Sequence, residues 1–436
     1  MKAVYLSSIL VLSAVLAGCG GSSNNDDATT DSYIQFYNGS AIAGSTQLKA
    51  GETNVGSTAY GDVSSVVGIE SGEYELAFTD SATSTELLKK TVSLAKDNKA
   101  LFILTNEGEQ YNHLNVSFKY DEQLDKKFNL HLVNLSSQQP ELDVYIAAEG
   151  KPFTDAELLD SLSRNEVTSA AKTRDIGKYN LYLTKPGQTT PIFTTQAVNF
   201  AYENTYVVLI RDKNGPLAGQ LSLDVVLNSS SVQANNNINA KAQFRLYNSL
   251  QQNVELALDS NVVASVAAGQ MSPYIASEKG DYSLSVRNDS ADLLLNSALL
   301  SINAGDSKMV LLYQNANAVV EALTSQEKDT PQLQAHDVMV ANLVPDLPKL
   351  QFYFVRQNET INTARYNIKN AEFKKQQSIN LPKDYYAIAL VHIAENGSTT
   401  LLDKTESMML EPGKHYSLLA EKNNAAPSGY QLKLVH

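Results

Sequence analysis

One strand-like segment recurs four times along this chain, and this repetition constrains the fold more than any other feature of the sequence. The segment reads SGEYELAF at residues 71–78, and its relatives are GKYNLYL at 177–183, GDYSLSV at 280–286 and KDYYAIAL at 383–390. Self-similarity at a regular interval indicates a repeat architecture in which every copy builds one structural unit. A chain of 436 residues has room for several such units.

Further landmarks accompany the tyrosine segment in a fixed order. An opening strand ends in asparagine at Asn38, Asn134, Asn248 and Asn342, with intervals of 96, 114 and 94 residues. After the tyrosine segment, each copy has two adjacent apolar residues and then further apolar residues at a wider spacing. A polar turn follows and leads into a continuous apolar strand. Each copy turns back into one more strand. Four ordered landmarks in four copies predict four related domains in tandem.

The chemistry of the copies is that of β-strands. Tyr74, Leu76 and Phe78 alternate with more polar residues, which places one face of the strand in a core and the other towards water. The continuous apolar strands fit central strands that are covered on both faces. Strands of this length with frequent turns predict an all-β fold, a tandem array of Ig-like antiparallel β-sandwiches. The tyrosine ring would pack inside while its hydroxyl reaches a backbone group, as in a tyrosine corner.

The fourth copy departs from this pattern. It has Lys383 where the other copies have glycine, and its apolar alternation includes Tyr386 and Ile388, one residue away from the direct match at Tyr385. A slip of one residue inverts the buried face of a strand, so the sequence leaves open which tyrosine is buried.

The second copy carries an insert that we expect to be helical, starting at Phe153 and ending near Arg164. Thr154 would cap the helix, Glu157 would complete a capping box, and Phe153 would pack on Leu158. Such a helix either covers a sheet edge or lines a binding surface.

The first residues are typical of a bacterial lipoprotein signal. Lys2 precedes a short apolar run, and Leu16-Ala17-Gly18-Cys19 is a lipobox, which predicts cleavage before Cys19 after lipidation of its thiol. Cys19 is the only cysteine of the chain, so the mature protein has no disulfide. The alternative is an ordinary cleaved secretory signal with a chance cysteine. Several acyl chains, palmitate among them, would anchor the protein stably to a membrane.

The chain therefore divides into an anchoring region and four domains. Gly20 follows the cysteine instead of aspartate, which by resemblance to enteric bacteria favours the outer membrane over the inner one. The polar stretch after it is expected to be a flexible tether, although its Asn24–Asp27 cluster could also be considered a calcium site. The predicted segments are a lipoprotein signal peptide (1–18), the lipidated Cys19 with its tether (19–32), and β-sandwiches at 33–126, 127–238 (with the helical insert), 239–328 and 329–436.

Charge and composition exclude one class of partner. The formal net charge is −13, which argues against a nucleic-acid partner because such binding depends on clustered Lys and Arg. The chain has 22 Tyr and no Trp, which suits β-sheet faces and weakens the case for an aromatic sugar-binding platform.

Several segments resemble a known family. The first copy contains FYN at 36–38, AYGDV at 59–63, GEY at 72–74 and KALF at 99–102, and the second copy adds LDVY at 142–145. These resemble a bacterial domain-of-unknown-function family, number four-three-nine-seven, whose pattern runs F-x-N, D-V-Y, A-Y-G-D-V, G-x-Y and K-x-Y. Copies two and three match in pieces and copy four matches weakly. The resemblance implies Ig-like envelope modules in tandem behind signal peptides, and it supplies no catalytic residues.

No catalytic, cofactor or metal site is predicted. The sequence has no G-x-S-x-G, no phosphate-cradling glycine loop and no H-E-x-x-H. Asp212-Lys213-Asn214-Gly215 has a faint calcium-loop pattern, but it lacks a downstream glutamate and fits a hairpin turn better. A triad assembled in space stays open. No two of the six histidines lie within four residues of each other: His113, His131, His336, His392, His415 and His436.

Three functions follow as hypotheses. The first is a non-catalytic, lipid-anchored envelope protein whose sandwich string serves adhesion, envelope assembly or the presentation of a protein or glycan partner. The second is a carbohydrate- or ligand-binding lipoprotein that serves uptake, and the third is a hydrolase of unrecognised type. A polar pocket at one of the inserts, residues 152–172 and 357–377, would favour the second or third hypothesis. Four equivalent, closed sandwiches would favour the first.

Overall fold

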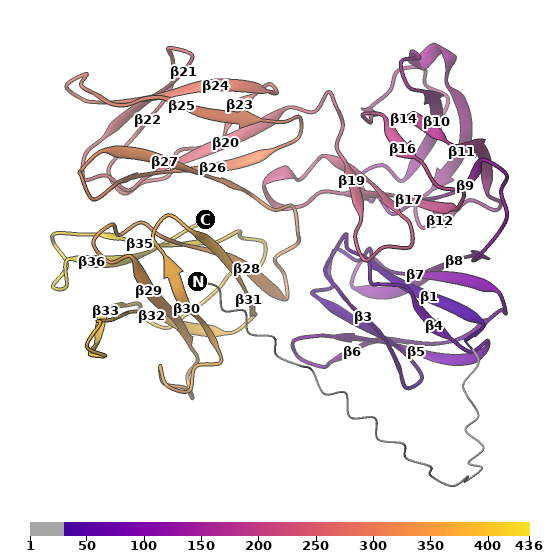
Figure 1. Cartoon of the computed structure of the whole chain (residues 1–436), viewed down its shortest axis with the longest axis horizontal. Coiled ribbons are helices and arrows are strands. Elements are labelled where there is room, and N and C mark those ends of the chain that lie inside the picture. The colour runs from indigo at the N-terminus through magenta and orange to yellow at the C-terminus, as the bar shows by residue number, and fades with distance from the viewer. Residues whose placement is uncertain (1–29) are drawn as a thin grey trace, which may run out of the picture.

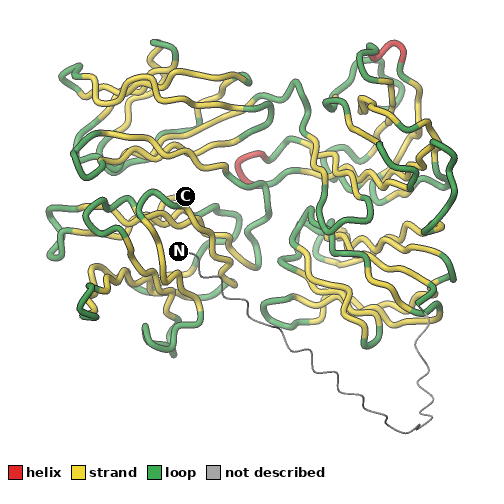
Figure 2. The backbone as a smooth tube through the Cα atoms, in the orientation of Figure 1, coloured by secondary structure: helices red, strands yellow, loops and turns green. Residues whose placement is uncertain are grey.

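The computed structural model describes residues 30–436, and nearly all regular structure in this range is β-strand (Figures 1 and 2). Two single 3₁₀ turns interrupt it, η1 (Phe153–Asp155) and η2 (Gly215–Leu217). The strands form eight sheets, two for each copy of the sequence repeat. The predicted all-β fold of sandwiches in tandem is confirmed.

The first and third domains have one topology. Each combines a sheet around its opening strand, in the order β4-β1-β7-β8 or β23-β20-β26-β27, with a sheet around its tyrosine strand, in the order β3-β2-β5-β6 or β22-β21-β24-β25. The strands of the first domain are β1 (Ser32–Asn38), β2 (Thr46–Ala50), β3 (Thr53–Thr58), β4 (Val67–Ile69), β5 (Gly72–Asp80), β6 (Glu86–Leu94), β7 (Asn98–Glu107) and β8 (Gln110–Lys119). Those of the third are β20 (Ala242–Asn248), β21 (Val254–Leu258), β22 (Asn261–Val266), β23 (Ile275–Ser277), β24 (Gly280–Asn288), β25 (Leu293–Ile302), β26 (Ser307–Gln314) and β27 (Val320–Gln326).

The second and fourth domains share a variant of this topology, in which an extra short strand, β16 or β34, also pairs with the tyrosine strand. The strands of the second domain are β9 (Lys127–Asn134), β10 (Glu141–Ala148), β11 (Glu157–Ser163), β12 (Glu166–Val167), β13 (Lys172–Asp175), β14 (Gly177–Thr184), β15 (Phe193–Thr194), β16 (Val198–Phe200), β17 (Thr205–Asp212), β18 (Leu221–Val226) and β19 (Gln233–Asn235). Those of the fourth are β28 (Ala335–Asn342), β29 (Lys349–Val355), β30 (Tyr366–Glu372), β31 (Gln376–Pro382), β32 (Tyr385–Ile393), β33 (Thr399–Lys404), β34 (Met408–Met409), β35 (Ser417–Lys422) and β36 (Tyr430–Val435).

The structural repeat is therefore a pair of domains. Asn38 and Asn248 end equivalent strands 210 residues apart, and Asn134 and Asn342 do so 208 residues apart. The alternating intervals between the four asparagines, short, long and short, reflect this pairing.

The sheets that contain the opening strands are mixed rather than purely antiparallel. Each opening strand runs parallel to the continuous apolar strand of its own domain: β1 to β7, β9 to β17, β20 to β26 and β28 to β35. All other strand pairs are antiparallel within residues 30–436, apart from one isolated parallel bridge between Asn342 and Phe373. Parallel neighbours need a long crossover connection, and the whole tyrosine-strand sheet of each domain lies in that connection.

Each sandwich encloses its own apolar core. Phe36, Phe78 and Phe102 are fully buried in the first domain, and Phe128, Phe193 and Phe200 fill the larger core of the second. Leu and Val residues dominate the third core, whereas Phe352, Phe354 and Tyr386 lie in the fourth.

Two further apolar cores lie between domains. One joins the sheet of β1 and β7 to the sheet of β9 and β17, and it includes Leu101, Ile103, Val207 and Leu209. The other joins the sheet of β20 and β26 to the sheet of β28 and β35, and it includes Leu311 and Leu419 among others. Figure 1 shows these sheets face to face, with the first and second domains on one side of the molecule and the third and fourth on the other. The continuous apolar strands are thus covered on one face by their own core and on the other by the partner domain.

The predicted helix of the second domain is wrong. Residues 153–155 form the 3₁₀ turn η1, and the following residues form strand β11, which pairs with β10 at a sheet edge. Leu159 and Leu162 are buried although they lie three residues apart, a spacing that suggests a helix in sequence. A β-bulge explains it, because Val144 pairs with Asp160 and Tyr145 with Leu158, which leaves Leu159 as the extra residue.

The predicted staple and cap are also absent from this segment as the structure describes it. Phe153 packs between Tyr145 and Tyr182 with ring centroids 5.2 and 5.3 Å away, instead of on the exposed Leu158. No side chain caps the turn η1. The segment does cover a sheet edge, as a strand rather than as a helix.

The tyrosine strands behave alike in all four domains. In each, the tyrosine hydroxyl donates to the backbone carbonyl four residues earlier: Tyr74 to Glu70, Tyr179 to Asp175, Tyr282 to Glu278 and Tyr386 to Pro382, over 2.8–3.0 Å. In the fourth domain Tyr386 is fully buried and Tyr385 is 55% exposed. The register that the sequence left open is therefore the one in which Tyr386 faces the core.

Candidate functional site

The residues that end the opening strands are structural. Asn38, Asn134, Asn248 and Asn342 are all fully buried. Each side-chain amide donates to at least two backbone carbonyls of the following segment, and each side-chain oxygen accepts the N–H two residues later. The most regular sequence signal of the repeat thus closes the end of a strand.

The other residues considered from sequence are distributed as follows. Cys19, the signal peptide and the Asn24–Asp27 cluster lie outside the described residues. Within residues 30–436, no helix is long and apolar enough to cross a membrane. No group of three or more His, Cys, Asp or Glu side chains that could hold a metal ion occurs in that range. The Asp212–Gly215 segment begins at the last residue of β17 and leads into the β17–β18 connection, and Asp212 accepts hydrogen bonds from Ser136 and Ser137.

A buried charge cluster marks the junction of the first and second domains. Asp224 accepts hydrogen bonds at 2.7 Å from both the Tyr37 hydroxyl and Arg211 Nε. Arg211 also forms an ion pair of 3.1 Å with Asp329, which lies in the segment that leads to the fourth domain. Burial raises the pKa of Tyr37, and the Asp224 carboxylate adds to the shift.

The AYGDV segment at residues 59–63 holds this cluster in place. The Tyr60 ring lies 5.1 Å from the Arg211 guanidinium, and its hydroxyl donates to the carbonyl of Asp212 at 2.8 Å. Gly61 has φ +78°, and a β-carbon there would lie 2.7 Å from Arg211 Nε. Val63 belongs to the core between the two domains. The segment that carries the family resemblance is therefore an interdomain contact.

The second pair repeats this junction with its charges exchanged. Tyr247, the equivalent of Tyr37, donates to both carboxylate oxygens of Glu421 at 3.0 Å. Glu421 occupies the position of Arg211. Each follows the residue that pairs with the asparagine of its opening strand: Ala420 with Asn342, and Ile210 with Asn134. Lys433 likewise occupies the position of Asp224, because Lys433 pairs with Leu419 and Asp224 pairs with the equivalent Leu209. A cation and an anion have thus changed places between the two pairs.

The first junction also contains a buried lysine. Lys99 is 1% exposed, and its ammonium group donates to the carbonyl of Leu227 at 3.1 Å and to Asn228 Oδ1 at 2.7 Å. Burial lowers the pKa of Lys99 to about 7.

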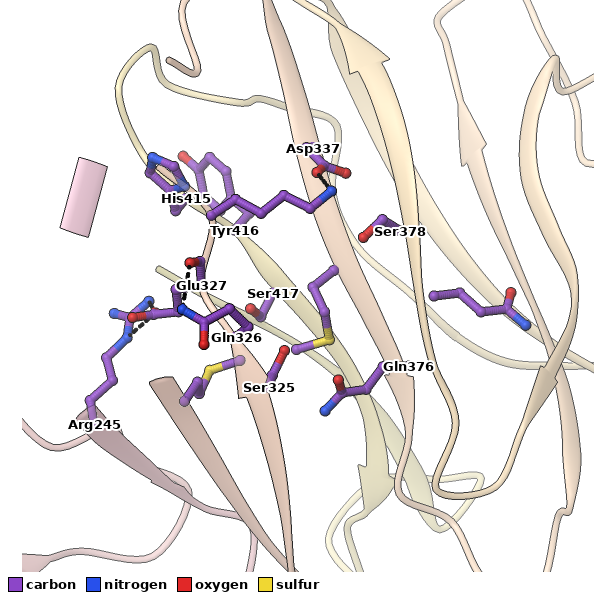
Figure 3. A pocket seen from close by; sticks show the side chains of 14 residues that line it. Arg245, Ser325, Gln326, Glu327, Asp337, Gln376, Ser378, His415, Tyr416 and Ser417 are labelled. Carbon is purple, nitrogen blue, oxygen red and sulfur yellow. Dashed lines mark hydrogen bonds and ion pairs between the residues drawn. The ribbon is translucent and has the colours of Figure 1, made fainter. Parts of the chain in front are cut away.

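The second junction contains a polar cavity of about 320 Å³ (Figure 3). It lies between β20, β26 and β27 of the third domain and β28, β31 and β35 of the fourth. Figure 3 labels Ser325, Ser417 and Gln376 among the side chains that line it. The lining residues are Arg245, Met309, Ser325, Gln326, Glu327, Lys328, Asp337, Met339, Gln376, Gln377, Ser378, His415, Tyr416 and Ser417.

The charged groups of this cavity are paired with each other. Arg245 and Glu327 form a buried ion pair of 2.7 Å, and the Arg245 guanidinium lies 4.9 Å from the Tyr274 ring. Glu327 also accepts hydrogen bonds from Ser307 and Tyr274. Lys328 pairs with Asp337. Burial, followed by the nearby Glu327 carboxylate, raises the pKa of Tyr274.

The two carboxylates of the cavity, Glu327 and Asp337, are held in ion pairs, and His415 is the remaining base of the lining. Burial lowers the pKa of His415, and a β-carbon on Gly215 would lie 2.0 Å from its Nε2, so the imidazole packs against η2 of the second domain. Sequence reasoning missed the cavity, although Gln376 and Gln377 belong to the second of the two inserts named above.

Similar solved structures include three bacterial proteins of low identity. The chain is 10% identical to the Bacillus anthracis TIE protein over 92% of this chain and 74% of that one, with TM-score 0.15. It is 10% identical to a DUF3823 family protein from Bacteroides ovatus (39% and 97% covered, TM-score 0.12) and 8% identical to the fimbrial anchor protein Mfa2 from Porphyromonas gingivalis (46% and 98%, TM-score 0.18). At these TM-scores we draw neither fold nor function from the similarities.

The family models give a clearer result. Comparison with curated proteins gives no match. Residues 32–145 match the model of a domain of unknown function, DUF4397. The match covers the first domain and ends at Tyr145 in β10 of the second, where the sequence contains the D-V-Y motif. This is the family that the AYGDV segment predicted, and the match to its model covers residues 32–145.

Proposed function

We propose that this protein is a non-catalytic, lipid-anchored protein of the bacterial cell envelope that presents two rigid two-domain blocks to a protein or glycan partner. The observation that carries the proposal is the pair of apolar cores between domains. An interface with an apolar core holds two domains in one orientation, whereas small polar contacts allow relative motion. Such blocks would hold a binding surface at a fixed geometry beyond the tether.

The use of the signature residues supports a structural role for the repeats. The buried asparagines and the core tyrosines bind their own backbone, and Tyr60 and Gly61 of the AYGDV segment serve a domain junction. A residue whose polar atoms are already bonded inside the fold is not available for chemistry on a substrate.

The membrane attachment rests on the lipobox. Cys19 is the only thiol of the chain and follows Leu16-Ala17-Gly18, and Gly20 favours the outer membrane. Ser32 begins β1 and Asp31 accepts hydrogen bonds from Ser71, so the tether expected for residues 20–32 would have to end before Asp31. The net charge of −13 supports partners other than nucleic acid.

The anchor is tested by metabolic labelling with an alkyne palmitate followed by membrane fractionation. The wild-type protein should carry the label and sediment with the outer membrane. Cys19→Ser should lose the label, and the double variant Cys19→Ser/Ser22→Cys should also lose it, because its thiol lies outside the lipobox. An unlabelled wild-type protein in the soluble fraction would contradict the proposed anchor.

One observation favours a second candidate, a ligand-binding lipoprotein. The polar cavity between the third and fourth domains has a volume at the lower end of that of small-molecule sites. Both functions are compatible with one anchored molecule, because the cavity lies inside one rigid block.

A further inference from the structure

We propose that the cavity between the third and fourth domains is a binding site for a small, uncharged polyhydroxylated molecule, with a monosaccharide as the simplest example. This inference goes beyond the envelope function and does not depend on the lipid anchor, because it rests only on groups in the second pair of domains.

The first support is a pair of buried hydroxyl groups, together with the amide oxygen of the exposed Gln326, that have free hydrogen-bonding capacity. Ser325 is 8% exposed and Ser417 is 5% exposed, and both line the cavity. Within residues 30–436, neither hydroxyl hydrogen-bonds another protein group, and Gln326 uses its amide nitrogen but not its oxygen. Hydroxyls donate and accept, and amide oxygens accept, so these groups match the hydroxyls of a sugar.

The second support is the absence of spare charge among the lining residues. The Arg245 guanidinium is held by Glu327, which receives two further hydrogen bonds, and Lys328 is held by Asp337. An anionic ligand would have to displace Glu327 from Arg245, and a cationic ligand would have to compete with Lys328. A buried charge that loses its partner is costly, so the site favours a neutral ligand.

The third support comes from the first pair of domains, which serves as an internal comparison. In the first pair of domains, Leu101 pairs with Gln35 on one side and with Val116 on the other. At the equivalent place in the second pair, Met309 pairs with Arg245 on one side and with Ser325 on the other. Ser325 therefore occupies the position of Val116. The same comparison holds for the other serine. His131 and Met339 occupy equivalent positions, and they pair with Val207 and Ser417 respectively, so Ser417 occupies the position of Val207.

The two equivalent positions have opposite character in the two pairs. Val116 and Val207 are each 1% exposed and belong to the continuous apolar core between the first and second domains. Small serines at both positions remove four methyl groups from the corresponding core of the second pair and put two hydroxyls there instead. A buried polar group that lacks a partner costs free energy unless water or a ligand satisfies it. The cavity thus differs from an ordinary packing defect by its hydroxyl lining.

Methionine residues allow the site to be tested directly. Met309 and Met339 line the cavity, whereas Met408 and Met409 form β34 in the other sheet of the fourth domain. The purified protein, labelled with ¹³C at the methionine methyl groups, is titrated separately with D-glucose, D-galactose and N-acetyl-D-glucosamine, up to about 10 mM. At least one neutral sugar should shift the Met309 and Met339 methyl signals in a saturable way and leave those of Met408 and Met409 in place.

Charged sugars of similar shape test the ligand class. D-galacturonate and D-glucosamine should each bind at least about tenfold more weakly than the best neutral sugar. Three results would overturn the proposal: no saturable shift with any neutral sugar, shifts confined to Met408 and Met409, or tighter binding of a charged sugar.

A cavity-filling variant tests the lining. Ser325→Val/Ser417→Val installs the residues of the first pair and should weaken the binding of the best sugar about tenfold or more. Ser93→Val makes the same change on the exposed face of β6 and should bind as the wild type does. If the double variant does not fold, Gln376→Ala removes one lining amide from β31 and should also weaken binding. Wild-type affinity in a folded double variant would contradict the site.

Discussion

At the scale of single residues, the strongest sequence signals of this protein proved to be structural, and the unusual residues lie between domains. The asparagine and tyrosine of each repeat bind backbone groups in the same way in every copy. Their spacing made them predictable, because a repeated local hydrogen bond needs a repeated local sequence. Lys99, Arg211 and Glu421 are different, because each contacts a residue of the partner domain and has no local pattern that reveals it.

The burial of Lys99 predicts a pH-dependent stability. The pKa of a lysine is about 10.4 in an unfolded chain, and burial lowers that of Lys99 to about 7. Between these values the unfolded chain binds more protons, so the contribution of Lys99 to stability rises with pH across this window and is least favourable below pH 7.

Lys99→Met should therefore increase the free energy of unfolding by roughly 2–4 kcal/mol at pH 6 and by much less at pH 10. Urea unfolding of both proteins at a series of pH values measures this difference. Lys90→Met, at an exposed position of β6, is the control and should change little at any pH. An equal gain for Lys99→Met at pH 6 and pH 10 would show that its ammonium group is not desolvated.

At the scale of strands and turns, the period-two pattern predicted strands correctly wherever a strand is regular. It failed at residues 153–164, where the bulge at Leu159 gives two buried leucines a helical spacing. Bulges depend on the partner strand, and a single sequence does not show which strand that is. The same limit left the register of the fourth tyrosine strand open until the pairing of Tyr386 with Met408 and of Phe354 with Ile388 was known.

That register gives a matched pair of variants. Tyr386→Ala should lower the free energy of unfolding of the unit formed by the third and fourth domains by about 3–5 kcal/mol, because it removes a fully buried ring. Tyr385→Ala changes a neighbouring tyrosine that is 55% exposed and should cost less than about 1 kcal/mol. Chemical denaturation measures both values, and a reversed order would contradict the register.

The turn at Gly61 provides a second matched pair. Gly61 and Gly150 have φ of +78° and +80°, so alanine introduces similar backbone strain at both positions. A β-carbon at Gly150 meets nothing within 4 Å, whereas at Gly61 it would meet the Arg211 guanidinium. Gly61→Ala should therefore cost about 2 kcal/mol more than Gly150→Ala. Thermal unfolding of both variants gives the difference, and equal costs would show that the guanidinium moves freely away.

At the scale of the whole molecule, the sequence predicted four sandwiches but not their arrangement in two pairs. The apolar outer faces of β7, β17, β26 and β35 were visible as continuous apolar runs, yet the same pattern fits any strand with two covered faces. The cavity was invisible for a related reason, because Ser325 and Ser417 come from different domains and acquire a role only when the two sheets face each other. Arg211 links the two pairs through its ion pair with Asp329.

The central claim is that each pair of domains is one cooperative unit, and calorimetric unfolding of the wild type and Ile103→Ala tests it most directly. Ile103 is fully buried in the core between the first and second domains. Its truncation should cost about 2–5 kcal/mol. We predict that the variant lowers the melting temperature of one transition that contains both the first and second domains, while the transition of the third and fourth domains stays in place. A shift confined to a transition of the first domain alone, with the second domain unfolding at its original temperature, would contradict the account.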